Sequence, residues 1–360
     1  MRNTPMLCSR RTSAAASAHT PSTVTEAVLP GIVDPEDIEV RTRAAVPAGP
    51  RQVVLALEAA GVSFAEQQMR RGKYYDQPPF PFVPGYDLIG RVVEAGEGVP
   101  ESVLGRRFAV LTKTGAWASH VTVDVRDLTE VPEQVDSAEA ETFVVNGITA
   151  WQMLHRLAKV RAGDTVLVHG ANGGVGSTLV QLARIAGATV VGTASTKHHQ
   201  AVRNLGATPV DYRVPDLEDA LREHAPQGYD AVFDHVGGEG IVASYRLLAP
   251  KGTLVSYGTA STRDVQGSSK APVLKLFARL MLWNALPNGK GAHFYNIWAG
   301  QRRHNAFRAK LSTDLSQVLA LLADGRLVPH VAARIPLTEV GEAVRLAESG
   351  TVVGKVVLVP

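Results

Sequence analysis

A glycine-rich turn carries the residue types and the spacing that could do chemistry. Residues 165–176 read TVLVHGANGGVG, so an apolar strand runs directly into the turn, and helix-forming residues follow it. On the dinucleotide fingerprint G-x-G-x-x-G the glycine positions fall on Ala171, Gly173 and Gly176, so the first glycine is replaced. A bare backbone can approach a pyrophosphate, and a helix start offers unpaired N–H groups to it, whereas the alternative is a purely structural turn. We predict a dinucleotide site at Gly173, Gly174, Val175 and Gly176.

The end of the second expected strand favours NADPH over NADH. A fold that prefers NAD places an Asp or Glu there, about 20 residues after the turn, to bind the ribose hydroxyls. Here the segment 192–197 reads GTASTK, and no acidic residue occurs between Asp164 and Asp211. Lys197 and Ser195 could bind a 2′-phosphate by charge-assisted hydrogen bonds. The alternative for Lys197 is a solvated lysine in the first turn of a helix.

The order of strand-like and helical segments predicts two kinds of domain. From about residue 24 to 146, short β-like runs are separated by Gly and Pro. From about residue 163 to 258, strand-like runs alternate with helical ones, which predicts a parallel, doubly wound α/β sheet. The chain ends in an apolar, strand-like run over residues 352–359.

Composition excludes several classes of protein. The 360 residues include 37 basic and 34 acidic ones, and the whole excess of +3 comes from three arginines within residues 1–25, so no basic stripe for nucleic acid remains. Residues 1–22 are predicted to be a disordered tail, with a transit peptide as the alternative. The charge-free stretch 165–183 contains four glycines and predicts strand, turn and helix, not a membrane span. The single Cys fits a reducing compartment, and we predict a cytoplasmic protein.

Metal catalysis is not predicted. Eleven His and one Cys are scattered without the spacing of a zinc site, and Cys8 lies in the tail. The adjacent His198 and His199 would point in different directions on a helix, so they are interpreted as surface polar residues.

These motifs, taken together, resemble a known family over roughly residues 24–360. The chain resembles the zinc-independent medium-chain dehydrogenases/reductases of the quinone oxidoreductase group, and residues 192–198 and the segment after Gly258 look most similar to the vesicle amine transport protein branch. The segments that carry the resemblance are 60–66 (AGVSFAE), 70–74 (RRGKY), 79–85 (PFPFVPG), 146–150 (NGITA), the glycine turn, 192–195 (GTAS), 234–238 (DHVGG) and 354–358 (GKVVL).

The resemblance implies a fold and an assembly. A Rossmann domain with a doubly wound parallel sheet (residues 146–324) would bind NADPH, and a discontinuous, β-rich GroES-like domain (residues 23–145 and 325–360) would bind substrate. The active site is expected in the cleft between them, outside the carboxyl ends of the strands. A homodimer is predicted.

The resemblance also implies site residues and shows departures. Zinc-dependent members carry a Cys and a Gly-His-Glu motif where this chain has Ser63 and residues 85–87 (GYD), so both ligand types are missing. Relatives usually have Asn at position 63 and Asp where Glu66 stands, and both positions border nicotinamide and substrate, so substrate preference is not carried over. By resemblance, the cofactor would contact Thr149 near the nicotinamide, Tyr212 at the adenosine end, and Val236 and Tyr257 along the groove.

The expected reaction is a metal-free, NADPH-dependent reduction of a quinone or an α,β-unsaturated carbonyl compound. Hydride transfer to such an acceptor produces a delocalised anion, and hydrogen-bond donors aimed at its oxygen lower the barrier. Tyr74 matches the family's tyrosine at the substrate mouth and could donate a hydrogen bond or a proton. Ser63 is a second candidate donor. A tyrosine that only packs in a loop, with solvent as the proton source, is the alternative.

Two other functions remain open at this point. One is tailoring enoyl reduction in a biosynthetic pathway, which uses the same machinery on a larger substrate. The other is a low-turnover NADPH-binding protein that acts at a membrane or partner surface through segment 273–283. That segment is apolar at positions 273, 276, 277, 280 and 281, which predicts an amphipathic helix. Core or interface packing and a substrate lid are the alternatives for it.

Overall fold

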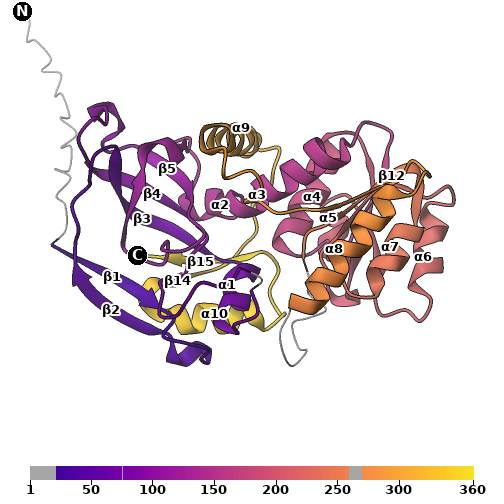
Figure 1. Cartoon of the computed structure of the whole chain (residues 1–360), viewed down its shortest axis with the longest axis horizontal. Helices are drawn as coiled ribbons and strands as arrows, with labels where there is room; N and C mark the ends of the chain where they lie inside the picture. The colour runs from indigo at the N-terminus through magenta and orange to yellow at the C-terminus, as the bar shows by residue number, and fades with distance from the viewer. Residues whose placement is uncertain (1–21, 75, 259–269) are drawn as a thin grey trace, which may run out of the picture.

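The computed structural model describes residues 22–74, 76–258 and 270–360, and it arranges them as two lobes (Figure 1). The predicted tail, except for Ser22, lies outside the described residues. The α/β fold class predicted from the sequence is confirmed: one lobe is β-rich and the other contains a parallel sheet.

The first lobe is built on a seven-stranded sheet with the order β14-β15-β3-β4-β5-β7, and β6 pairs with the first half of β3. The bounds of its strands are β1 Thr23–Val28, β2 Glu39–Ala44, β3 Gln52–Val62, β4 Asp87–Ala95, β5 Arg107–Leu111, β6 His120–Asp124, β7 Thr129–Glu130, β14 Val331–Pro336 and β15 Lys355–Val359. Its helices are α1 Phe64–Arg70, α2 Ser137–Glu141 and α10 Val340–Glu348. Strands β1 and β2 form a separate antiparallel pair.

The last strand completes the first lobe. β15 pairs antiparallel with β3 and parallel with β14, so the C-terminal strands, yellow in Figure 1, complete the sheet that β3 to β7 begin. β15 begins at Lys355, three residues later than the apolar run predicted.

The second lobe is a six-stranded sheet with the order β10-β9-β8-β11-β12-β13, and its pairings are parallel. Its strands are β8 Thr165–Val168, β9 Thr189–Ala194, β10 Thr208–Asp211, β11 Tyr229–Asp234, β12 Leu248–Ser256 and β13 Gly291–Phe294. The helices between them are α4 Gly174–Ile185, α5 His199–Asn204, α6 Leu217–His224, α7 Gly240–Arg246 and α8 Lys270–Ala285. β13 was not predicted, because it is short and contains a glycine and a histidine.

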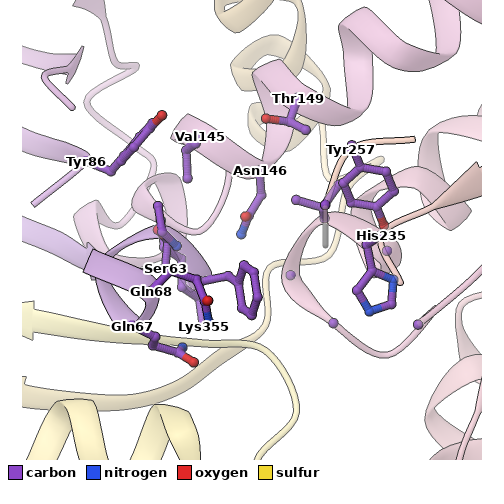
Figure 2. Close-up of a pocket in the computed structure, with 18 of the residues that line it drawn as sticks. Ser63, Gln67, Gln68, Tyr86, Val145, Asn146, Thr149, His235, Tyr257 and Lys355 are labelled. Atoms are coloured by element: carbon purple, nitrogen blue, oxygen red, sulfur yellow. The ribbon is translucent and has the colours of Figure 1, made fainter. Parts of the chain in front are cut away.

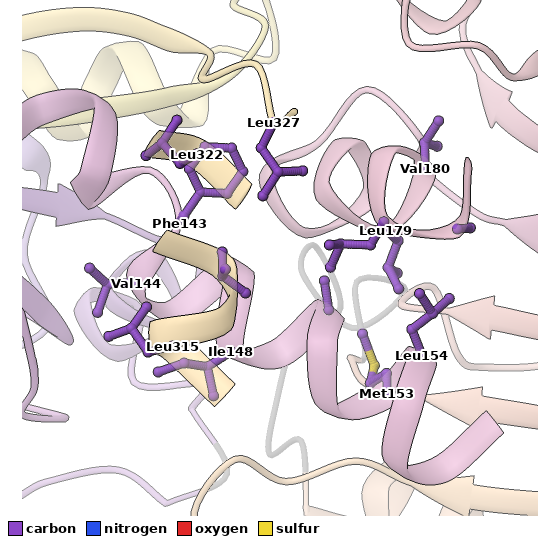
Figure 3. Close-up of a cluster of buried hydrophobic side chains, with 14 of the residues drawn as sticks. Phe143, Val144, Ile148, Met153, Leu154, Leu179, Val180, Leu315, Leu322 and Leu327 are labelled. Carbon is purple, nitrogen blue, oxygen red and sulfur yellow. The ribbon is translucent and has the colours of Figure 1, made fainter. Parts of the chain in front are cut away.

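Two further helices join the lobes. α3 (Val144–Trp151) continues into a π-helical stretch, Gln152–Ala158, and packs against α4 and α9 (His304–Ala323). Its polar residues Asn146 and Thr149 face the cleft (Figure 2). Its apolar residues join a buried cluster with residues of α4 and α9, among them Val144, Ile148, Leu179, Leu315 and Leu322 (Figure 3). This shared core fixes α3 between the lobes.

The amphipathic segment 273–283 lies within α8, but its apolar stripe is divided. Leu276 and Leu280 are buried against the second lobe, whereas Phe277 and Met281 are exposed. The side chain at position 273 lies outside the described residues. Among the helices that the structure describes, none is long and apolar enough to cross a membrane.

Candidate active site

A cavity of about 460 Å³ lies between the lobes, at the carboxyl ends of β8, β11 and β12. Its walls come from α1, α3, the glycine turn, the loops after β11, β12 and β13, and the start of β15. Figure 2 shows how residues from both lobes point toward it. In an open α/β sheet this edge is the position at which ligands bind.

The glycine turn is shaped by its protein neighbours. Gly170 adopts a φ of +66°, and an added Cβ there would lie 2.4 Å from the His235 ring, so this residue makes the tight turn. The sequence alignment had given that position to Ala171, and the structure moves it one residue earlier. The methyl group of Ala171 is buried against Gly192, where an added Cβ would come within 2.5 Å of it. The Ala171 methyl group, which stands where the fingerprint has a glycine, is therefore accommodated by the absence of a side chain at Gly192 on β9.

The second half of the turn leaves room for a ligand. At Gly173 an added Cβ would meet only the carbonyl oxygen of Gly170, at 3.3 Å, whereas at Gly176 it would lie 2.1 Å from that oxygen. α4 begins at Gly174, and no side chain caps its first N–H groups. Gly173, Gly174, Val175 and Gly176 all line the cavity. A bare backbone at an uncapped helix start fits a pyrophosphate.

A buried hydrogen-bond network supports the turn from below. Ser244 donates to the Asp234 carboxylate at 2.6 Å, so the His169 Nε2–H donates to the Ser244 oxygen at 3.1 Å. Burial lowers the pKa of His169, and its neutral Nδ1 accepts from the Thr193 hydroxyl at 3.2 Å. The Thr193 oxygen in turn accepts the Gly170 N–H. The network thus joins the loop after β8 to the ends of β9 and β11 and to α7.

Four residues predicted to contact the cofactor lie outside the cavity lining, at the ends of β9, β10 and β11: Ser195, Lys197, Tyr212 and Val236. Ser195 is buried and precedes the 3₁₀ turn Thr196–His198. Lys197 donates to the Gly350 carbonyl at 3.0 Å, so it connects the second lobe to a segment of the first. Tyr212 and Val236 are 53% and 37% exposed, so both are accessible to a ligand.

One cation at this end was not found from the sequence. Arg213 forms an ion pair with Asp211 and also donates to the Thr196 hydroxyl at 3.4 Å. Arg213 and Thr196 together lower the pKa of the Asp211 carboxyl. Arg213 thus neutralises the acidic group at the end of β10 that would otherwise repel a 2′-phosphate. It follows Tyr212 directly, but no motif marks it.

The part of the cavity where the nicotinamide is predicted to bind is formed by α3 and the loop after β12. Thr149 and Tyr257, both predicted, line the cavity, and Asn146 lies beside them. The Asn146 amide donates to the Thr142 carbonyl at 2.9 Å, which fixes it against the glycine turn. Burial, with a smaller effect of the nearby Asp234 charge, raises the pKa of Tyr257 and keeps its phenol protonated.

Ser63 lines the cavity but gives its proton to a protein group. It caps α1: its oxygen accepts the Ala65 N–H, and its hydroxyl donates to the Glu66 carboxylate. Glu66 is buried and also accepts the N–H of Ser63 and, at 2.7 Å, the N–H of Tyr86. Burial raises the pKa of Glu66, and the nearby Asp87 charge adds to this. The predicted role of Ser63 as a donor to substrate stays a prediction.

Tyr74 belongs to an aromatic hydrogen-bonded group. Its phenol oxygen lies 2.8 Å from that of Tyr86, and both residues line the cavity. The Trp298 indole N–H donates to the Tyr86 oxygen, and the Tyr86 and Trp298 ring centroids are 5.8 Å apart. In the sequence, position 86 stands out only as a lost zinc ligand, and nothing in the spacing connects it with Trp298.

A fully buried charge cluster lies under the floor of the cavity. Lys355 at the start of β15 donates hydrogen bonds from its Nζ to Asp87 of β4 at 2.9 Å and to Glu141 of α2 at 2.7 Å. The Asp87 carboxylate also accepts the Val145 N–H, at the start of α3. Burial raises the pKa of Glu141 well above its ordinary value, and the Asp87 charge adds to this effect. We therefore expect Glu141 to hold its proton more readily than an ordinary glutamate.

Comparison with known proteins assigns the chain to a family. Profiles described as an alcohol dehydrogenase GroES-like domain and a zinc-binding dehydrogenase match residues 49–133 and 205–358. The human synaptic vesicle membrane protein VAT-1 homolog is 34% identical over 345 residues, which cover 92% of this chain and 86% of that protein. A solved mycobacterial quinone oxidoreductase is 26% identical, with a TM-score of 0.77 over 94% of this chain and all of that one. This chain belongs to the zinc-independent medium-chain dehydrogenases/reductases, in the quinone oxidoreductase group.

A member of this family has been solved with the dinucleotide. It is a mycobacterial protein in complex with NADPH, 25% identical, with a TM-score of 0.78 over 94% of this chain and all of that one. The chain is therefore an oxidoreductase of the medium-chain family, and NADP(H) binding is supported. Within the residues that the structure describes, no group of three or more His, Cys, Asp or Glu side chains could hold a metal ion.

Two glycine substitutions separate ligand binding from the architecture of the turn. In Gly173→Ala we expect a melting temperature close to that of the wild type, but at least about tenfold weaker NADPH binding, because the methyl group takes pyrophosphate space. In Gly176→Ala we expect both the melting temperature and the NADPH affinity to fall, because the added methyl group would clash with the Gly170 carbonyl. Thermal unfolding and fluorescence titration with NADPH measure the two effects. Unchanged NADPH affinity in Gly173→Ala would contradict the assignment.

The charge cluster predicts a pH-dependent stability. The pKa of Glu141 is raised in the folded state. Its contribution to the free energy of unfolding is therefore full below the unfolded-state pKa of about 4.3 and is lost as pH rises through the folded-state pKa. Glu141→Gln is neutral at every pH, so its free energy of unfolding should stay within about 1 kcal/mol of wild type and should depend less on pH between these two pKa values. Urea unfolding across pH measures this.

Lys355→Met is the matched comparison in the same cluster. It leaves the Asp87 carboxylate buried without its ammonium partner, so we expect a loss of about 3–5 kcal/mol in the free energy of unfolding. If Glu141→Gln loses as much as Lys355→Met, Glu141 is ionised in the folded protein and our assignment is wrong.

Proposed function

We propose that this chain reduces quinones or α,β-unsaturated carbonyl compounds with NADPH. The observation that carries the proposal is that the glycine turn of one lobe and the Tyr74–Tyr86 pair of the other line one cavity. A dinucleotide cradle and a phenol donor facing the same space suit hydride transfer to a polarised acceptor. When bound, NADPH would supply the hydride at its nicotinamide ring.

The second lobe and α3 would bind and orient the cofactor. The N–H groups at the start of α4 would hold the pyrophosphate, and Thr149 and Tyr257 would contact the nicotinamide end. Ser195 and Lys197 would bind the 2′-phosphate, and Arg213 nearby adds a second positive charge. Tyr212 and Val236, both exposed, would flank the adenosine and the groove.

The first lobe would bind and polarise the acceptor. Much of the cavity wall around the acceptor is apolar or aromatic, which suits a flat conjugated molecule and excludes water. The first lobe contributes Val62, Phe64 and Ala65, and the second contributes Phe294 and Ile297. Tyr74 would donate a hydrogen bond to the acceptor oxygen, where negative charge develops. We assign this role to Tyr74 because the Ser63 hydroxyl already donates to Glu66.

The chemistry of the acceptor decides how much Tyr74 contributes to the rate of reduction. Hydride addition to a quinone gives a hydroquinone anion, which water can protonate without help. Addition to an enone gives a more basic enolate, so a positioned acid is worth more there, up to about 10²–10⁴-fold in rate. Comparing a small quinone with a small enone therefore tests the reaction class and the role of Tyr74 together.

Parallel assays with NADPH and NADH test the proposed function. We expect oxidation of NADPH by a small quinone, a small enone or both, with kcat/KM at least about tenfold higher for NADPH than for NADH, because one or two charge-assisted contacts are added. Lys197→Ala should lower kcat/KM for NADPH and leave that for NADH unchanged. Initial rates of dinucleotide oxidation give these values.

Arg203→Ala is the control for loss of one positive charge, since Arg203 is exposed and lies at the end of α5, near Lys197 in sequence. It should change neither rate. If Lys197→Ala lowers kcat/KM equally for NADPH and NADH, Lys197 only connects the lobes through Gly350. Tight NADPH binding without turnover of either acceptor would contradict the proposed reaction.

A further inference from the structure

We propose that Tyr86 and Trp298 are positioning residues that make Tyr74 a stronger acid through a one-way chain of hydrogen bonds. This inference rests on the proposed function, in which Tyr74 protonates the acceptor oxygen. Neither Tyr86 nor Trp298 has to touch the substrate for this role. Trp298 acts on Tyr86, and Tyr86 acts on Tyr74.

Chemistry fixes the direction of the first bond of the chain, and the direction that we propose for the second, from Tyr86 to Tyr74, leaves the Tyr74 O–H to the acceptor. An indole N–H can only donate, so the Tyr86 oxygen must accept from Trp298. The Tyr86 O–H lies 2.8 Å from the Tyr74 oxygen and can donate to it. A donated hydrogen bond makes a hydroxyl a better donor in turn, since bonds in such a chain polarise one another.

The chain stabilises the product of proton transfer. When hydride adds to the β-carbon of an enone, the electrons of the C=C bond shift and the carbonyl oxygen becomes an enolate. The Tyr74 O–H bond then breaks, its proton bonds to that oxygen, and a phenolate remains on Tyr74. Donation from Tyr86, itself polarised by Trp298, stabilises this phenolate, and solvent later returns the proton.

Each member is held by its own surroundings. Tyr86 is only 3% exposed, and its backbone N–H donates to Glu66 while its carbonyl accepts the Thr112 N–H at 2.8 Å. The Trp298 backbone N–H donates to Asn296 at 2.9 Å, and its ring contacts Phe307, with a centroid distance of 5.9 Å. The side chains therefore keep their geometry without a substrate to arrange them.

The chain also crosses the boundary between the lobes. Tyr86 precedes β4 of the first lobe, whereas Trp298 follows β13, the last strand of the second lobe's sheet. These residues are 212 positions apart in the sequence. Tyr74 is therefore fully supported only while the lobes hold this arrangement, which couples the strength of the acid to closure of the cleft.

Tyr86→Phe and Trp298→Phe remove single hydrogen-bonding atoms and keep aromatic rings in place. In enone reduction we expect Tyr86→Phe to lower kcat about tenfold with KM little changed, and to move the alkaline limb of the pH profile up by about one unit, because Tyr74 becomes a weaker acid. Trp298→Phe should act in the same direction but less. In a Tyr74→Phe background, Tyr86→Phe should have no further effect on kcat.

Matched controls come from a second aromatic pair. Tyr245 stacks on Trp283 at 4.2 Å in the second lobe, and its hydroxyl accepts from Asn288. Tyr245→Phe and Trp283→Phe should leave the pH profile unchanged. If Tyr86→Phe lowers kcat equally with and without Tyr74, or does not move the alkaline limb, Tyr86 is only structural and the proposal fails.

A spectroscopic titration keeps the test independent of turnover. The ultraviolet absorbance of tyrosinate, taken as the difference between each protein and its Tyr74→Phe counterpart, gives the pKa of Tyr74 directly. We expect that pKa to rise in Tyr86→Phe by about one unit. If the wild type reduces no enone but the pKa of Tyr74 still rises in Tyr86→Phe, the proposed function is contradicted and the hydrogen-bonded chain is supported. If the pKa of Tyr74 is unchanged in Tyr86→Phe, the proposed hydrogen-bonded chain is contradicted.

Discussion

The buried ammonium of Lys355 is the interaction on which the rest of the structure depends. It lies on the last strand and is enclosed with the carboxyl groups of Asp87 and Glu141, so β15 must return to the first lobe to provide that pairing. Gly61 opposite it has no room for a side chain, since an added Cβ would lie 2.2 Å from the lysine Cε. A buried charge without its partners costs several kcal/mol, so the cluster disfavours other ways of closing the sheet.

The same cluster sets the position of the cleft wall. Asp87 accepts the Val145 N–H, and Glu141 ends the helix that leads into α3. α3 then brings Asn146 and Thr149 to the cavity, while its other face joins the core shared with α4 and α9. On the opposite side, the network centred on His169 holds the loop after β8 against the ends of β9 and β11 and against α7. The site is therefore built on two buried polar networks, one in each lobe.

Local patterns made much of this predictable. The alternation of strands and helices predicted the parallel sheet, and the glycine spacing located the turn, because both depend on residues close in sequence. What local spacing could not show are pairs such as Trp298 with Tyr86 or Lys355 with Glu141, which are 212 and 214 residues apart. The Ala171 departure was also not interpretable from sequence, because its explanation, Gly192, lies on a neighbouring strand. The stripe in α8 was divided for a similar reason: only packing decides which apolar residues are covered.

The central claim is that the cleft brings an NADPH nicotinamide and a conjugated acceptor into contact, with a phenol beside the acceptor oxygen. The most direct test is to follow the label from NADPH carrying deuterium at the transferable position on C4, using a small enone in ordinary water and mass spectrometry of the product. The account predicts deuterium at the β-carbon of the saturated product and a solvent proton at its α-carbon. A product whose β-hydrogen comes from water, with the label left on the dinucleotide, would contradict it.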